Sequence, residues 1–95
     1  MNIQCLQQAM REAYYERDRG RGLYATFTWL VEEIGELAEA ILDGDKTRIE
    51  EEIADVIAWT LSLANLLEVD VGKAMSRKYG KDLERAGCTG HELPH

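Results

Sequence analysis

The chain has 95 residues, enough for one domain, and carries a formal net charge of −7 from 18 acidic and 11 basic side chains. This charge argues against a bare nucleic-acid binder or a binder of anionic membranes, because either would need a basic face. No apolar run approaches the roughly 20 residues needed to span a bilayer, and the N-terminus lacks the pattern of a signal peptide. Cys5 and Cys88 form no Cys-x-x-Cys pair, so we expect a cytoplasmic protein.

Apolar residues recur at helical spacing between the glycines and predict one all-α domain over residues 1–95. The predicted helices span about residues 3–18, 24–42, 47–67 and 71–86. A loop is expected at 20–22 and a tight turn at Gly44, and residues 88–95 are expected to form a short tail. A four-helix-bundle-type domain of this size has a small core, so we also expect a homo-oligomer.

The two central helices each carry an apolar stripe that predicts a buried face. The stripes consist of Phe27, Leu30, Val31, Ile34, Leu37, Ala38 and Ile41, and of Ile49, Ile53, Val56, Ile57, Thr60, Ala64 and Leu67.

Two carboxylates lie beside each stripe, Glu33 and Glu36 on the first central helix and Glu52 and Asp55 on the second. At about 100° per residue, each pair occupies the border of its stripe, with its members on adjacent turns. The midpoints of the two pairs average to residue 44, which is the turn itself. In an antiparallel hairpin both pairs therefore lie at the same height, and the four carboxylates are expected to converge.

Four converging carboxylates repel one another unless a cation lies between them. Ligation by oxygen alone favours Mg²⁺, with Mn²⁺ as a second candidate. Such ions bridge phosphate oxygens and offset charge on a leaving group, so the cluster suits phosphoanhydride hydrolysis. The competing interpretation is a solvated acidic face, which should contain interleaved basic partners. Between Arg21 and Lys46 the sequence has none.

Glu32-Glu33-Ile34-Gly35-Glu36, followed on the next helix by Glu52-Ile53-Ala54-Asp55, resembles the MazG-like all-α nucleoside triphosphate pyrophosphohydrolases. Relatives of that family include dimeric dUTPases and dCTP pyrophosphatases, and the resemblance covers about residues 24–80. It implies Mg²⁺-dependent hydrolysis of standard or modified (deoxy)nucleoside triphosphates between the α and β phosphates, which releases a monophosphate and pyrophosphate. It also implies a homodimer or a homotetramer.

The resemblance also implies roles for individual residues. The metal ligands would be Glu33, Glu36, Glu52 and Asp55. Glu32 would join Glu33 in the catalytic site and help to orient or deprotonate the attacking water. Gly35 would leave room for a close approach beside the metal.

Other residues are candidates for contacts with the substrate. Trp29 and Trp59 also average to residue 44, so they could form a platform for the base, although packing at the bundle rim is an alternative. Asn65 lies off the apolar stripe and could contact the sugar or the base. Arg77 and Lys78 of the fourth helix could reach the phosphates, unless they are ordinary solvated residues.

Three other interpretations of the sequence compete with this one. Cys88, His91 and His95 lack a fourth zinc ligand, and a redox di-iron bundle would need Glu-x-x-His pairs that neither central helix contains. A non-catalytic acidic adaptor, or a bundle that merely binds metal, is the remaining alternative. The adaptor predicts no change of stability with Mg²⁺ and no release of pyrophosphate.

Overall fold

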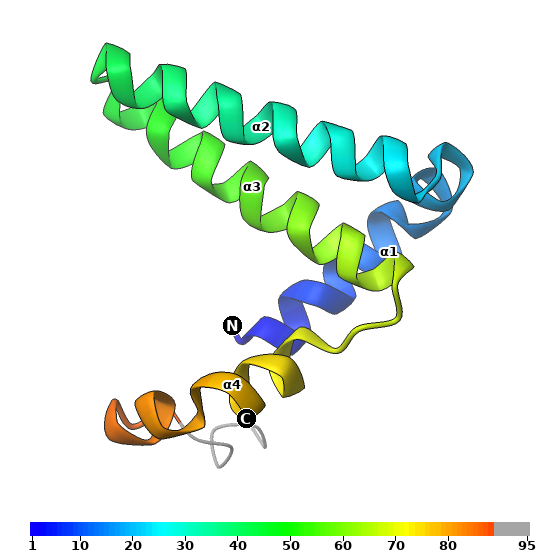
Figure 1. Cartoon of the computed structure of the whole chain (residues 1–95), viewed down its shortest axis with the longest axis vertical. Coiled ribbons are helices and arrows are strands. Elements are labelled where there is room, and N and C mark those ends of the chain that lie inside the picture. Colours follow the sequence, from blue (N-terminus) through cyan, green and yellow to red (C-terminus); the bar gives the residue numbers. More distant parts are fainter. Residues whose placement is uncertain (89–95) are drawn as a thin grey trace.

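The computed structural model describes residues 1–88 and contains four helices. These are α1 (Ile3–Arg21), α2 (Leu23–Asp43), α3 (Lys46–Leu66) and α4 (Val71–Arg85). Helices α2 and α3 run side by side as an antiparallel hairpin, and α1 crosses the hairpin near the end opposite its turn (Figure 1). The prediction of an all-helical, four-helix fold is confirmed. Within residues 1–88, no helix combines the length and apolar character needed to cross a membrane.

The hairpin is fixed by the turn between α2 and α3. Gly44 ends α2 in the left-handed conformation, at φ +70°, and its N–H donates to the carbonyl groups of Ala40 and Ile41. Asp45 caps α3, since its side chain accepts a hydrogen bond from the N–H of Arg48. Only two residues separate the helices, so they must turn back against each other.

The loop expected at residues 20–22 is smaller than predicted. Helix α1 continues through Gly20 and Arg21, and only Gly22 is non-helical, at φ +99°. The extra turn is stabilised locally, because Arg21 pairs with Asp18 at 3.1 Å and the N–H of Gly22 donates to the Asp18 carbonyl at 2.9 Å. Glycine tolerates a helical position, so Gly20 alone does not end the helix.

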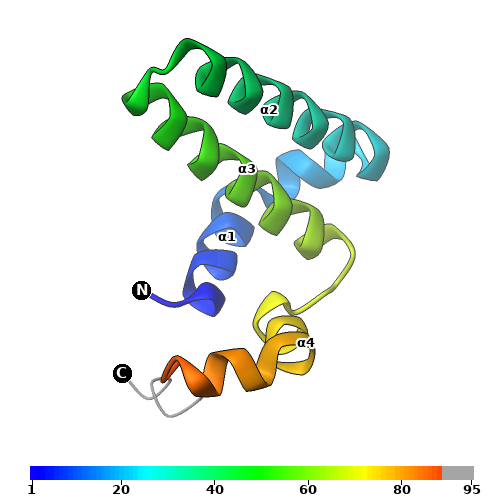
Figure 2. The same ribbon diagram turned by 60° about the vertical axis from the view of Figure 1, so that its left-hand side comes forward.

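Helix α4 lies apart from the hairpin and packs mainly against α1 (Figure 2). Its backbone leaves helical geometry at Tyr79, where φ is −120° and ψ is 24°. None of its residues is buried, so α4 does not cover the hairpin as a fourth bundle helix would.

The apolar core is small and lies mainly toward the end of the hairpin that α1 crosses, while Ala40 is buried near the turn. Among residues 1–88, the buried apolar side chains are Leu30, Ala40, Leu61 and Ala64. Four polar side chains are buried as well, namely Asp18, Thr26, Ser62 and Asn65. Of these, Asn65 bonds to Gln7 of α1, whereas Asp18 bonds to arginines of its own helix.

Much of the predicted apolar face of the hairpin is uncovered. Six of its side chains are 44–58% exposed: Phe27, Val31, Ile34, Ile41, Ile53 and Ile57. We call these six residues the open hairpin face. The physical reason is that α1 reaches only one end of the hairpin while α4 turns away.

Candidate metal centre

The hairpin brings three of the four predicted ligands together. Glu33 comes from α2, while Glu52 and Asp55 come from adjacent turns of α3. One carboxylate oxygen from each residue lies within 4.8 Å of the others. We call these three residues the acidic cluster. It is a candidate site for a divalent cation formed by oxygen ligands alone.

One oxygen atom of the cluster lacks the hydrogen-bond partner that its burial requires. Oε1 of Glu52 is buried and has no hydrogen-bond partner among the described residues. A buried carboxylate oxygen without a donor is energetically costly. A cation within reach of Glu33 and Asp55 would satisfy it, so the donor set is compatible with Mg²⁺.

The electrostatics of Glu33 show how strongly the cluster needs positive charge. Burial raises the pKa of Glu33 above its ordinary value near 4.5, and the negative charge of Asp55 raises it further. The neighbouring carboxylate of Glu52 acts in the same direction, whereas the indole of Trp59 partly opposes the rise in pKa. A cation bound at the cluster would therefore favour the ionised form of Glu33.

Glu36, the fourth predicted ligand, points to a different partner. Its Oε2 lies 3.6 Å from Nη2 of Arg48. The same guanidinium group also contacts Glu39 at 3.2 Å and Asp43 at 3.1 Å. The expectation that the acidic stretch has no basic partner is therefore wrong. Arg48 approaches across the hairpin from α3, so a search for partners within α2 could not find it.

Glu32 and Gly35 lie on α2 beside the acidic cluster. Glu32 is exposed and makes no hydrogen bond or ion pair within residues 1–88, so its carboxylate is free to meet solvent or substrate. A Cβ added at Gly35 would have no neighbouring atom within 4 Å. No close approach within this chain therefore requires the glycine.

Trp29 and Trp59 form a stacked pair one helical turn from the acidic cluster. Their ring centroids are 6.1 Å apart and their planes are inclined by 16°, as their equal distance from Gly44 predicts. Trp29 is 44% exposed, so part of the pair remains accessible beside the carboxylates.

Helix α1 adds charged residues to this end of the site that the sequence interpretation missed. Oδ1 of Asp18 accepts hydrogen bonds from Arg17 at 3.3 Å and Arg21 at 3.1 Å. Both guanidinium groups also lie over the Trp59 ring, at 5.6 Å and 4.9 Å from its centroid. Asp18 is only 1% exposed, and the signal available in the sequence was its position between two arginines at helical spacing.

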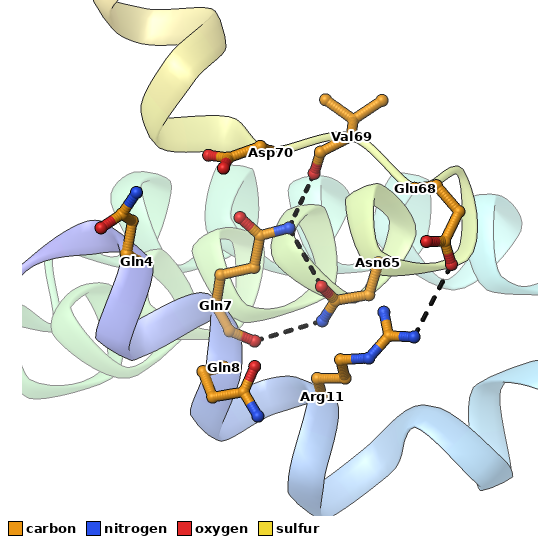
Figure 3. A pocket seen from close by; sticks show the side chains of 8 residues that line it. All are labelled: Gln4, Gln7, Gln8, Arg11, Asn65, Glu68, Val69 and Asp70. Carbon is orange, nitrogen blue, oxygen red and sulfur yellow. Dashed lines mark hydrogen bonds and ion pairs between the residues drawn. The ribbon is translucent and has the colours of Figure 1, made fainter.

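Asn65 lies elsewhere, in the contact between α1 and the segment that links α3 to α4. Its amide group donates to the Gln7 carbonyl at 3.2 Å, and its Oδ1 accepts from Nε2 of Gln7 at 3.0 Å. Gln7 also donates to the carbonyl of Val69 and accepts from the N–H of Val71. Gln7, Asn65 and Val69 border an open polar pocket of about 330 Å³ (Figure 3). Asn65 thus ties the end of α3 to Gln7 of α1, which in turn binds the start of α4.

Arg77 and Lys78 are exposed on α4. Lys78 lies 5.8 Å from the ring of Tyr79, and α4 is placed away from the hairpin (Figures 1 and 2). Within one chain these side chains are not brought to the acidic cluster. Of the zinc candidates, Cys88 is exposed, while His91 and His95 lie outside the described residues.

The structure is thus an all-helical domain with a cluster of carboxylates on its central hairpin. The model of the MazG nucleotide pyrophosphohydrolase domain matches residues 21–86, which is well over half of the chain. The chain belongs to this family. No curated protein matches it. The matched segment contains the hairpin and α4, whereas nearly all of α1 precedes it.

Proposed function

We propose that this chain is a Mg²⁺-dependent nucleoside triphosphate pyrophosphohydrolase that converts standard or modified (deoxy)nucleoside triphosphates into monophosphates and pyrophosphate. The observation that carries the proposal is the acidic cluster with its unpartnered Glu52 oxygen, in a chain of the MazG family. A cytoplasmic location fits such a role in nucleotide pools.

The residues of the hairpin would divide the work of hydrolysis. Glu33, Glu52 and Asp55 would hold the metal, and Glu36 would complete the set. Mg²⁺, when bound, offsets charge on the phosphates and makes water a better nucleophile. Glu32 lies next to Glu33 and is exposed, so its carboxylate could orient the attacking water and accept its proton.

In the reaction, the water oxygen forms a bond to the α phosphorus. The bond from that phosphorus to the oxygen bridging the α and β phosphates breaks, and the electron pair leaves with pyrophosphate. The proton of the water passes to Glu32 or Glu33.

The substrate would lie along the hairpin. Trp29 and Trp59 would stack with the base, since an aromatic surface accepts any nucleobase. Arg77 and Lys78 would contact the phosphates only from a neighbouring chain, because in their own chain α4 lies away from the cluster. Asn65 would contact the substrate only if it gave up its hydrogen bonds to Gln7.

A homodimer or homotetramer would bury the open hairpin face. Six apolar side chains about half exposed along two adjacent helices are unfavourable in water, at roughly 25 cal/mol per Å². A second copy of the chain would cover them and could bring its own α4 to the site. Sedimentation of the wild type and of Ile57→Glu tests this, and a wild-type chain that sediments as a monomer would contradict it.

The activity is tested by incubating the protein with Mg²⁺ and a panel of nucleoside triphosphates, with separate assays for pyrophosphate, orthophosphate and monophosphate. We expect pyrophosphate and monophosphate in equal amounts and no orthophosphate. Asp55→Asn and Glu36→Gln should lower the rate by at least 100-fold, on the order of 3 kcal/mol of transition-state stabilisation. Full activity in both variants would refute the ligand assignment.

A non-catalytic acidic adaptor remains the alternative outcome of the same panel. It predicts no product from any triphosphate and no change of melting temperature with Mg²⁺. A bundle that only binds metal predicts the stability change without the product.

A further inference from the structure

Arg48 lies in the same row of α3 side chains as the acidic cluster. It precedes Glu52 by four residues and Asp55 by seven, so the three share one face of the helix. Across the hairpin it faces the acidic residues at the end of α2. Its guanidinium contacts Glu36, Glu39 and Asp43 at 3.6, 3.2 and 3.1 Å.

Glu36 therefore lies between two possible partners, the acidic cluster and Arg48. Its distance from Gly44 equals that of Glu52, so its position on α2 is level with the acidic cluster. Its carboxylate nevertheless pairs with Arg48, and it is not among the three residues whose oxygen atoms converge. Joining the cluster requires Glu36 to leave the guanidinium.

The other two partners of Arg48 allow Glu36 to leave the guanidinium. Glu39 and Asp43 each lie closer to the guanidinium than Glu36 does. When Glu36 turns away, Arg48 keeps two carboxylates and is not left without a counter-charge. The contact to Glu36 is also partly exposed on both sides, at 31% and 40%, so it is weak enough to be given up.

We propose that Arg48 is a positioning residue that holds Glu36 out of the acidic cluster and competes with the divalent cation for it. This role rests on the proposed function, since it presumes a metal bound by Glu33, Glu52 and Asp55. Arg48 sets how tightly the metal binds, because its positive charge near the cluster and its hold on Glu36 both oppose binding.

The test is the affinity of the metal-free protein for Mn²⁺, measured by electron paramagnetic resonance of the free ion. Arg48→Gln should bind Mn²⁺ about three- to tenfold more tightly than the wild type, an order-of-magnitude estimate for one charge near an exposed site. The difference should shrink as salt is added, because exposed charges are screened. Arg48→Lys keeps the positive charge, so its affinity for Mn²⁺ should stay closer to that of the wild type.

Arg85→Gln is the matched control. It removes the same charge from an exposed ion pair with Asp82 on α4, and it should leave the Mn²⁺ affinity unchanged. A second readout is the Nε–H signal of Arg48 in nitrogen-15 spectra, which should shift as Mg²⁺ is added.

The outcomes separate this role from the proposed function. Equal or weaker Mn²⁺ binding by a folded Arg48→Gln would overturn the role of Arg48 and leave the metal site intact. A wild-type chain that binds no Mn²⁺ would overturn the metal site itself, and the role of Arg48 with it. Equal tightening in Arg85→Gln would show an effect of net charge alone and would also overturn the proposal.

Discussion

Trp29 and Trp59 stack across the hairpin with their ring centroids 6.1 Å apart. They lie at equal distances from Gly44 on opposite sides of the turn, and so do Glu33 and Asp55. Trp29 is four positions from Glu33, and Trp59 is four positions from Asp55. At a rise of about 1.5 Å per residue, the aromatic pair and the carboxylate pair lie about 6 Å apart along the helices. The aromatic pair therefore adjoins the acidic cluster on the side away from the turn.

This proximity predicts a role for Trp59 in binding substrate. Replacing it by leucine should raise KM by about tenfold, because stacking with a base is worth roughly 1–3 kcal/mol. The value of kcat should change little, since the carboxylates remain. Steady-state kinetics with one triphosphate provide the measurement, and Trp59→Phe is the control that keeps an aromatic ring. An unchanged KM in the leucine variant would contradict the platform.

The hairpin and its cluster could be predicted because both depend on short-range information. A two-residue turn fixes which positions of α2 and α3 face each other, and helical spacing fixes which side chains share a face. Glu33 and Asp55 therefore meet as the residue numbers require. The start of α4 at Val71 depends on equally local information, since the side chain of Asp70 caps the helix.

The contacts of Arg48 and Asp18 could not be predicted in the same way. Arg48 neutralises carboxylates of the preceding helix, whereas sequence patterns of ion pairs consider neighbours within one helix. Asp18 is buried because α1 crosses the hairpin at that point, and the crossing depends on tertiary packing. The apolar stripes identify which faces avoid water, but not whether this chain or another covers them.

The pKa of Glu33 makes stability depend on pH. A raised pKa means that the folded state binds this proton more tightly than the unfolded state does. The stabilisation is fully present below the ordinary value near 4.5 and is lost as the pH rises through the raised pKa. In metal-free buffer, Glu33→Gln should therefore gain stability relative to the wild type as the pH rises above the ordinary value near 4.5.

Urea unfolding at several pH values measures this gain. The control is Glu51→Gln, an exposed residue of α3 outside the acidic cluster, which should follow the wild type across the range. Addition of Mg²⁺ at neutral pH should stabilise the wild type and have little effect on Glu33→Gln. A constant difference between Glu33→Gln and the wild type at all pH values would contradict the prediction.

Asp18 should be important for stability, because its carboxylate is buried and accepts hydrogen bonds from two arginines. Asp18→Asn should lower the free energy of unfolding by about 2 kcal/mol, the range for hydrogen bonds to charged groups. Glu16→Gln is the comparison, since its pair with Arg19 is exposed and 3.9 Å long, and it should cost under about 0.5 kcal/mol. Equal effects of the two changes, measured by thermal and urea unfolding, would show that burial of Asp18 is unimportant.

The contact between Gln7 and Asn65 should attach α4 to the rest of the chain. Gln7→Ala removes three side-chain hydrogen bonds, including the one from the N–H of Val71, and should cost about 1–2 kcal/mol. Amide hydrogen exchange at Val71 should accelerate while exchange in the hairpin stays slow. Gln8→Ala is the matched control, because Gln8 bonds only to Glu12 of its own helix.

A comparison of Gln7→Ala with Asn65→Ala separates two roles of Asn65. If Asn65 acts by holding Gln7, which binds the start of α4, the two variants should change activity in parallel. If Asn65 contacts the substrate, Asn65→Ala should raise KM much further than Gln7→Ala does.

Glu68 follows α3 in the left-handed region, at φ +57°, which a residue with a side chain occupies at a cost of about 1 kcal/mol. The conformation is required because the N–H of Val69 turns back to the Ala64 carbonyl at 2.9 Å. Glu68→Gly should therefore stabilise the fold by about 0.5–1 kcal/mol, after allowance for the greater freedom of glycine in the unfolded chain. The lost ion pair with Arg11 is long, at 3.6 Å, and largely exposed, so it offsets little of this gain.

The free energy of unfolding in urea should be higher for Glu68→Gly than for the wild type. It should be equal to the wild-type value or lower for Glu68→Ala, since alanine loses the ion pair and keeps the strain. A glycine variant no more stable than the alanine variant would show that the backbone at this position is not strained.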